Sequence, residues 1–309
     1  MIPATMAELP PPPAFDDPAL LVPRPGDDGA SRVHADVQYA QIPGYRPLVL
    51  DLTVPATEGT AVPVVVGIHG GAWLSGTHKT MPDDLTPYRM LWPALLERGI
   101  AVATIQYRHS REAVFPAQIQ DVRAAIRWLR RAAPALGLDG SRIGVIGDSA
   151  GGHLALLLGT NADVPGFDGD FGVTDESARV DRVVAWYPPT RLDTMQQETA
   201  PDSPFSHDAA DAPESLLLGV PPSEDRERAR WASPISYVSN ESAPTLLVHG
   251  TADLVVPFAQ SVAHDEALRS AGVPSTLIPV PDADHVFLGA DPAPIVVASA
   301  DFLAEGLLP

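Results

Sequence analysis

The stretch that most constrains this chain is residues 142–159, where a short apolar run meets a glycine-rich turn and an apolar helix pattern follows at once. The turn, Gly147-Asp148-Ser149-Ala150-Gly151, matches the pattern G-x-S-x-G. Small residues beside a serine permit a tight, strained strand-to-helix turn that lifts the hydroxyl clear of a sheet. We therefore expect a strand over 142–146, a helix from Ala150 and a nucleophilic Ser149 between them. A plain strand-to-helix turn is the alternative.

The rest of the chain continues this alternation of strand and helix patterns. Residues 62–68 form a continuous apolar, β-branched run, which is typical of a strand buried on both faces. After Pro116, apolar residues recur at helical spacing from Ile119 to Leu129 and indicate an amphipathic helix. Further strands are expected at 47–54, 100–107, 182–187, 245–249 and 275–280, and further helices at 85–98, 257–271 and 294–306. This rhythm predicts a mostly parallel α/β sheet with helices on both faces.

Two segments depart from this rhythm. Residues 1–34 are rich in proline, and we expect them to form an extended arm over the body or a frayed tail. Residues 188–240 are rich in Pro, Asp, Glu and Ser and carry only short apolar pieces, so we expect a small cap inserted between two strands. The predicted organisation is therefore an arm (1–34) and one catalytic domain (35–309) with a cap at about 188–240.

Charge and composition exclude several function classes. A formal net charge of −19 opposes binding to nucleic acid and to anionic membrane surfaces. The absence of cysteine excludes disulfides, thiolate metal sites and cysteine nucleophiles. The N-terminal residues lack the basic and apolar regions of a secretory signal, so we expect a cytoplasmic protein, with export left open.

Open parallel sheets bind ligands at the carboxyl ends of their strands, so reactive side chains that follow predicted strands are the candidates for a site. Ser149, Asp253 and His285 each follow one, in the order that is typical of α/β-hydrolases. We expect His285 to act as general base for Ser149 and Asp253 to orient that histidine. Asp282 and Asp284 share the loop of His285 and cannot easily reach its Nδ1.

A nucleophilic serine also needs hydrogen-bond donors for the oxyanion that forms on its substrate. Gly70 and Gly71 follow the predicted strand at 62–68 and can point backbone N–H groups into a site without a Cβ in the way. Ala150 begins the helix after the serine. We expect the amides of Gly70, Gly71 and Ala150 to form the oxyanion hole, with a simple strand-ending glycine turn as the alternative.

The chain has nine histidines, and the one nearest to Ser149 is not the expected base. His153 points sideways from the first helical turn, whereas a serine on such a turn points away from the helix, so we expect His153 to be structural beneath the oxyanion turn. The remaining assignments are surface positions for His34, His78 and His207, a loop brace for His69, no role for His109, a packed turn residue for His249 and a solvated helix position for His264.

Five sequence segments together resemble a known family: HGGAW, GDSAGGHLA, SPISYV, PTLLVHGTADLVVP and DADHVF. They are similar to the α/β-hydrolases of the hormone-sensitive-lipase type, above all to the bacterial esterase branch related to feruloyl and acetylxylan esterases and to kynurenine formamidase. The resemblance covers roughly residues 35–305. It implies the α/β-hydrolase fold, a Ser149–His285–Asp253 triad and the three oxyanion donors named above.

One residue departs from the family's pattern. Ala72 stands where a third glycine often follows His-Gly-Gly, although Trp73 after it is similar to the HGG-x-W form of the same branch. Activity on tertiary-alcohol esters, which is usually tied to the longer glycine run, is therefore in doubt.

These observations favour a serine carboxylesterase that acts on uncharged small-molecule esters with acyl groups of about two to six carbons. An arylformamidase-type amide hydrolase is the close alternative, and a non-catalytic binding protein a distant one. No HExxH motif is present, the Asp-rich loop at 163–175 indicates a solvated turn, and neither metal nor cofactor is expected. Neither nucleic acid nor membrane is expected as a partner, and a homodimer is left open. Candidate pocket residues are Trp73, Leu74, Tyr187, Leu217 and Trp231.

Overall fold

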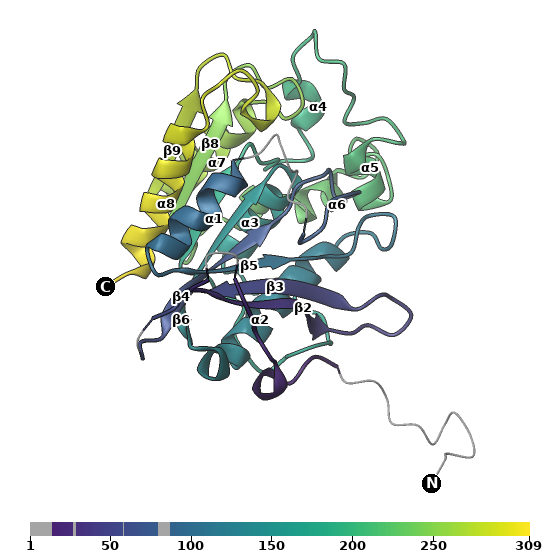
Figure 1. Ribbon diagram of the computed structural model, residues 1–309. Helices are drawn as coiled ribbons and strands as arrows, with labels where there is room; N and C mark the ends of the chain where they lie inside the picture. The colour runs from purple at the N-terminus through teal and green to yellow at the C-terminus, as the bar shows by residue number, and fades with distance from the viewer. Residues whose placement is uncertain (1–13, 27–28, 58, 80–86) are drawn as a thin grey trace, which may run out of the picture.

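The alternating patterns produce a single twisted sheet in the computed structural model (Figure 1). The structure describes residues 14–26, 29–57, 59–79 and 87–309. Within these residues, the sheet has nine strands in the order β1-β2-β3-β5-β4-β6-β7-β8-β9. Their bounds are β1 Arg24–Pro25, β2 Arg32–Ala40, β3 Leu48–Val54, β4 Val62–Ile68, β5 Ala101–Ile105, β6 Leu138–Asp148, β7 Arg182–Trp186, β8 Thr245–Gly250 and β9 Ser275–Val280.

The sheet is parallel from β5 to β9 and antiparallel at its N-terminal edge, where β1, β2 and β3 pair. Every residue of β4 is buried, as its apolar, β-branched sequence predicts for a central strand covered on both faces. Alternate side chains enter different cores: Val64 and Val66 join one apolar cluster, and Val65 joins the other. The mostly parallel α/β architecture predicted from the sequence is confirmed.

Helices cover both faces of this sheet. α1 and α8 pack against each other on one face, and α2, α3 and α7 cover the other (Figure 1). These helices span α1 Tyr88–Glu97, α2 Ala117–Leu136, α3 Ala150–Gly159, α7 Ala259–Ser270 and α8 Ala293–Leu307. Helix α1 was predicted over 85–98; residues 85 and 86 lie outside the described part of the chain. No described helix combines the length and apolarity that a membrane crossing requires.

The N-terminal arm contributes more to the sheet than its proline content predicts. Strand β2 begins at Arg32, so the boundary predicted at residue 34 falls inside a strand. Upstream, Asp16 exchanges backbone and side-chain hydrogen bonds with Gln38 of β2, and its carbonyl accepts the Trp128 indole N–H at 3.3 Å. The turn η2 (Pro18–Leu20) follows at once. Proline restricts helices and central strands, but it does not prevent pairing at a sheet edge.

Residues 188–240 form irregular chain punctuated by short helices, gathered at the upper right of Figure 1. These are α4 Met195–Glu198, α5 Pro213–Leu218, α6 Arg226–Trp231 and η3 Pro234–Tyr237. Side chains of α5 and α6 enter the core, with Leu217, Leu218 and Ala229 fully buried. The segment is therefore anchored to the body.

Candidate active site

The structure brings Ser149, His285 and Asp253 into one hydrogen-bonded chain. Nε2 of His285 lies 3.2 Å from the Ser149 hydroxyl oxygen, and Nδ1 of the same ring lies 2.8 Å from Oδ2 of Asp253. The serine follows β6, the aspartate follows β8 and the histidine begins η4 (His285–Phe287) after β9. Residues far apart in sequence meet because parallel strands end at the same edge of the sheet.

Ser149 lies on a strained turn that only its glycine neighbours permit. Its backbone adopts φ 50° and ψ −119°, and its amide donates to the carbonyl of Trp186 at 2.9 Å. A Cβ at Gly147 would lie 2.2 Å from the Gly151 carbonyl oxygen, and a Cβ at Gly151 would lie 2.0 Å from that of Ile68. Both glycines are therefore required by close backbone contacts.

The carboxylate of Asp253 is surrounded by donors. Its Oδ1 accepts the amides of Val255 and Val256, both at 2.8 Å. Its Oδ2 faces His285 and also Nε2 of His249, at 3.2 Å. Burial raises the pKa of this carboxyl, but the hydrogen bonds from the two histidines outweigh burial and hold the pKa well below its usual range. Asp253 is therefore an anion over the whole neutral and mildly acidic range.

An aspartate within the loop that carries His285 holds this loop in place. Oδ1 of Asp284 accepts the amides of Leu254 and His285, which ties this loop to the loop of Asp253. On its other side the His285 ring meets Tyr187 edge-on, with 4.7 Å between ring centroids. Tyr187, predicted as a pocket residue, is fully buried and packs against His285 as well as Phe287.

The oxyanion turn differs from its prediction at Gly70. The amide of Gly70 donates to Oδ1 of the buried Asp148 carboxylate at 3.0 Å, so it is engaged and does not point into the site. The Tyr88 hydroxyl donates to the same oxygen at 3.1 Å. The pKa of Asp148 is raised to about 6 by burial, which these two hydrogen bonds only partly offset. Sequence spacing did not reveal this contact because Asp148 ends β6, whereas Gly70 follows β4.

Gly71 and the residue after it shape the rest of the turn. Gly71 has a φ of 98°, and its carbonyl accepts the amides of Leu74 and Ser75. Ala72 and Trp73 both adopt a φ of 56°, which is uncommon for residues with a Cβ. The amide of Ala72 is not used within this turn, a feature that the His-Gly-Gly pattern alone did not identify.

His153 links three parts of the site, as its predicted structural role requires. Its Nδ1 accepts the Trp73 indole N–H at 3.3 Å, and its Nε2 donates to the Ala232 carbonyl at 2.7 Å. Burial lowers the pKa of His153 to about 4, so the ring is neutral at physiological pH. Trp73 is 1 % exposed and therefore braces the oxyanion turn instead of lining an open pocket.

The other predicted pocket residues differ in how far they are buried. Leu217 belongs to the core, and its carbonyl accepts the Phe115 amide. Trp231 is half-buried, with its ring edge-on to Phe115 at 4.9 Å between centroids. Leu74 is half-buried beside the oxyanion turn. For Leu217, the apolar character that suggested a pocket instead serves the core.

Four histidines were expected at the surface or in solvent, and the structure contradicts this. His34, His78, His207 and His264 are all buried, with at most 8 % of their surface exposed. A loop or helix position in the sequence does not reveal which face meets the core. His69 does brace its turn, with Nδ1 donating to the Gly70 carbonyl at 2.8 Å.

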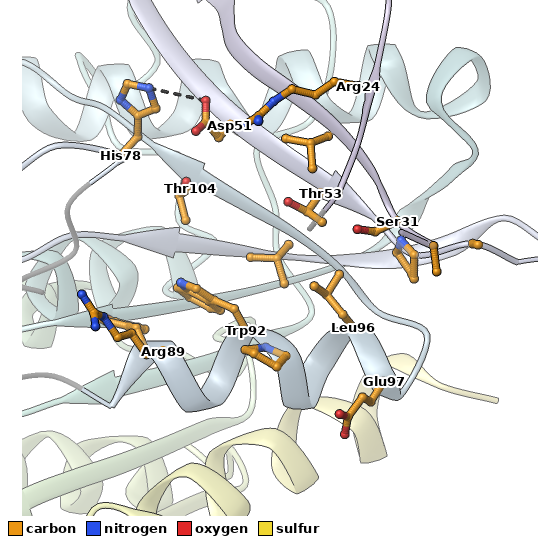
Figure 2. A pocket seen from close by; sticks show the side chains of 18 of the residues that line it. Arg24, Ser31, Asp51, Thr53, His78, Arg89, Trp92, Leu96, Glu97 and Thr104 are labelled. Carbon is orange, nitrogen blue, oxygen red and sulfur yellow. Dashed lines mark ion pairs between the residues drawn. The ribbon is translucent and has the colours of Figure 1, made fainter. Parts of the chain in front are cut away.

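A cavity of about 760 Å³ lies away from the triad, between α1 and the antiparallel edge of the sheet (Figure 2). Trp92 and Leu96 of α1 face Thr53 and Thr104 of the strands across it. At one end, ligand atoms of Asp36, Asp51 and His78 lie within 4.8 Å of one another, the one such group among the described residues. The Lys79 ammonium bonds both carboxylates, at 2.8–3.0 Å, so this group already holds a cation of the protein itself.

Comparison with known proteins gives one consistent result. The BD-FAE family matches residues 50–268. Esterase LipQ of Mycobacterium tuberculosis is 31 % identical over 275 residues, which are 87 % of this chain and 61 % of LipQ, so the chain spans about three-fifths of that relative. A truncated carbohydrate esterase from gut microbiota superposes with a TM-score of 0.79 at 32 % identity, over 92 % of this chain and 99 % of that one. An esterase of Thermogutta terrifontis, Est2, superposes with a TM-score of 0.68 at 26 % identity, over 92 % and 96 % of the two chains.

Proposed function

The chain belongs to the BD-FAE family of α/β-hydrolase esterases, and we propose that it is a carboxylesterase that cleaves small, uncharged esters through an acyl-enzyme on Ser149. The observation that carries this proposal is the continuous hydrogen-bonded chain from Ser149 through His285 to Asp253. The esterase relatives support ester hydrolysis in general, and the roles of individual residues are our inference from geometry.

In the proposed reaction, Nε2 of His285 takes the proton of the Ser149 hydroxyl as the oxygen attacks the ester carbonyl carbon. The imidazolium then gives that proton to the departing alcohol, which leaves an acyl group on Ser149. Water, activated by the same nitrogen, hydrolyses the acyl-enzyme. The Asp253 carboxylate keeps the proton of neutral His285 on Nδ1, so that the lone pair of Nε2 faces the serine.

We assign stabilisation of the tetrahedral oxyanion to backbone amides. Ala150 begins α3, where first-turn amides have no acceptor within the helix. Gly71 remains a predicted donor, and Ala72 replaces Gly70 because the Gly70 amide is bound to Asp148. The positive end of the α3 dipole adds to the same effect.

We propose acyl groups of about two to six carbons as the preferred substrates. The cap consists of short helices anchored in the core, and it offers little apolar surface for a long chain. A net charge of −19 disfavours anionic esters. A relative from Pseudomonas putida, 29 % identical over 79 % of this chain, is named ethyl acetate hydrolase, which is consistent with a small acyl group.

The proposal is tested with p-nitrophenyl esters of increasing acyl length, with a feruloyl ester and N-formylkynurenine as comparators. We expect the highest kcat/KM on short acyl esters, no effect of a chelator, and a loss of about 10⁴-fold or more in Ser149→Ala. A maximum on long chains would contradict the acyl range, and a higher kcat/KM on N-formylkynurenine would favour the amide hydrolase. Full activity in Ser149→Ala would contradict the serine mechanism.

A further inference from the structure

Asp253 lies next to a second histidine, which the proposed reaction does not use. His249, the fifth residue of β8, is completely buried. Its Nε2 lies 3.0 Å from the Val256 carbonyl oxygen and 3.2 Å from Oδ2 of Asp253. Its Nδ1 lies 2.7 Å from the hydroxyl oxygen of Ser261 in α7. Both ring nitrogens therefore have defined partners.

The partners determine which nitrogen carries the proton. Nε2 faces two oxygens that can only accept, the Val256 carbonyl and the ionised Asp253 carboxylate, so we assign the proton to Nε2. Nδ1 then accepts the hydroxyl proton of Ser261. The reverse tautomer would point a lone pair at a carboxylate in a buried site, which is strongly unfavourable. The N–H of His249 is thus held by the Val256 carbonyl, with its positive end 3.2 Å from Oδ2 of Asp253.

Two imidazole N–H groups consequently lie against the same oxygen. His285 donates to Oδ2 of Asp253 at 2.8 Å, and Nε2 of His249, whose hydrogen bond goes to the Val256 carbonyl, lies 3.2 Å from that oxygen. We propose that His249 is a positioning residue that limits how strongly Asp253 stabilises protonated His285, and thereby keeps the base active at lower pH. The inference rests on the proposed function, since it acts through the base that activates Ser149.

The direction of the effect follows from the charge on Oδ2. An N–H group whose positive end lies close to an anionic oxygen makes that oxygen a weaker acceptor for another donor. Removal of the His249 N–H leaves more of the charge available to the imidazolium of His285 and favours its protonated form. The acidic limb of kcat/KM, which reports protonation of the base in the free enzyme, then moves to higher pH.

Other titratable groups also face this pair. The described titratable residues that interact with Asp253 or His285 come from the end of β6, the residue after β7, the end of β8 and the loop after β9; they are Asp148, Tyr187, His249 and Asp284. Helix α7 contributes Ser261, which does not titrate. A substitution at His249 alone leaves the other groups in place, so a shift of the limb is attributable to the lost donor.

The test compares three variants of the full chain in kcat/KM on p-nitrophenyl acetate from pH 4 to pH 9. His249→Leu removes the donor, whereas His249→Gln places an amide N–H close to the position of Nε2. His264→Leu is the matched control, because His264 is a buried imidazole of α7 with no bond to the triad among the described contacts. We expect the acidic limb to move up by about half a pH unit or more in His249→Leu and to stay near wild type in the other two.

An unchanged limb in His249→Leu, or an equal shift in His264→Leu, would overturn the proposal and leave His249 as a packing residue. If His249→Leu does not fold, ¹⁵N NMR of histidine-labelled wild-type enzyme provides the test, with His249→Gln to assign the signal. We expect the proton of His249 to lie on Nε2; protonation at Nδ1 alone would overturn the proposal. Activity that persists in Ser149→Ala would instead show that the proposed function is wrong.

Discussion

Two buried carboxylates flank the nucleophile, and their surroundings differ in one decisive way. Asp253 accepts two backbone amides and the His285 N–H, and Nε2 of His249 lies 3.2 Å from its Oδ2. Asp148, one residue before Ser149, accepts one amide and one phenol hydroxyl. The pKa of Asp253 lies well below its usual range, because hydrogen bonds from two histidines overcome burial, whereas burial raises the pKa of Asp148 to about 6.

The comparison indicates how two carboxyl groups in one site come to have different roles. The number and kind of donors decide which of them remains an anion below about pH 6, and Asp253, which is ionised there, can stabilise a developing imidazolium. Asp148 requires only an acceptor oxygen to hold the Gly70 amide and the Tyr88 hydroxyl. An isosteric amide at each position therefore distinguishes a need for charge from a need for a hydrogen bond.

The largest expected effect is that of Asp253→Asn. The neutral amide has no anionic oxygen to face His285 and His249. Its NH₂ group also favours the wrong tautomer of His285, the base. We expect kcat to fall by about 10⁴-fold with an intact fold, as steady-state kinetics and circular dichroism would show. A loss below tenfold would mean that the charge of Asp253 is dispensable.

Asp148→Ala should have the next largest effect. It removes the acceptor of the Gly70 amide, so the oxyanion turn loses its anchor to the nucleophile loop. Because oxyanion donors act in the transition state, we expect kcat to fall by about 10- to 100-fold with little change in KM. A rise in KM at constant kcat would place the defect in substrate binding instead.

Asp148→Asn should retain most activity, because its carbonyl oxygen can still accept from Gly70 and Tyr88. We expect kcat within about fivefold of wild type. The stability of the two proteins should respond differently to pH. The native pKa of Asp148 is raised to about 6, above that of the unfolded chain, so the wild type loses stability as the pH rises from about 4 through 6.

Thermal midpoints at several pH values test this linkage. The stability of Asp148→Asn relative to wild type should increase between pH 4 and pH 7 and then level off. A constant difference across that range would mean that Asp148 does not titrate there, and kcat as low as in Asp148→Ala would mean that its charge is needed.

The smallest expected effect concerns a buried histidine outside the triad. Burial lowers the pKa of His264 to about 3, so the unfolded chain takes up a proton below about pH 6.5 that the native state does not. His264 thus reduces stability as the pH falls from 6.5 toward 4. His264→Leu should flatten this decline in urea midpoints while leaving kcat unchanged; an equally steep decline would contradict the assignment.

The sequence predicted the parts of the site that depend on strand ends. Ser149, Asp253 and His285 each follow a strand, and a parallel sheet brings such positions together whatever their separation along the chain. The sequence did not predict that Asp148 would bind Gly70 or that His249 would lie against Asp253, since both contacts depend on side-chain direction at the end of a strand. The surface assignment of His264 was wrong because a weakly amphipathic helix does not show which side meets the core.

The most direct measurement is the rate at which a fluorophosphonate labels the protein, followed by intact mass and by peptide mapping. We expect a single adduct on Ser149, formed at close to the wild-type rate in Asp148→Asn and at least about 100-fold more slowly in Asp253→Asn. A label on another residue, or equal rates in the two amide variants, would contradict the claim that Asp253 and not Asp148 supplies the charge behind the nucleophile.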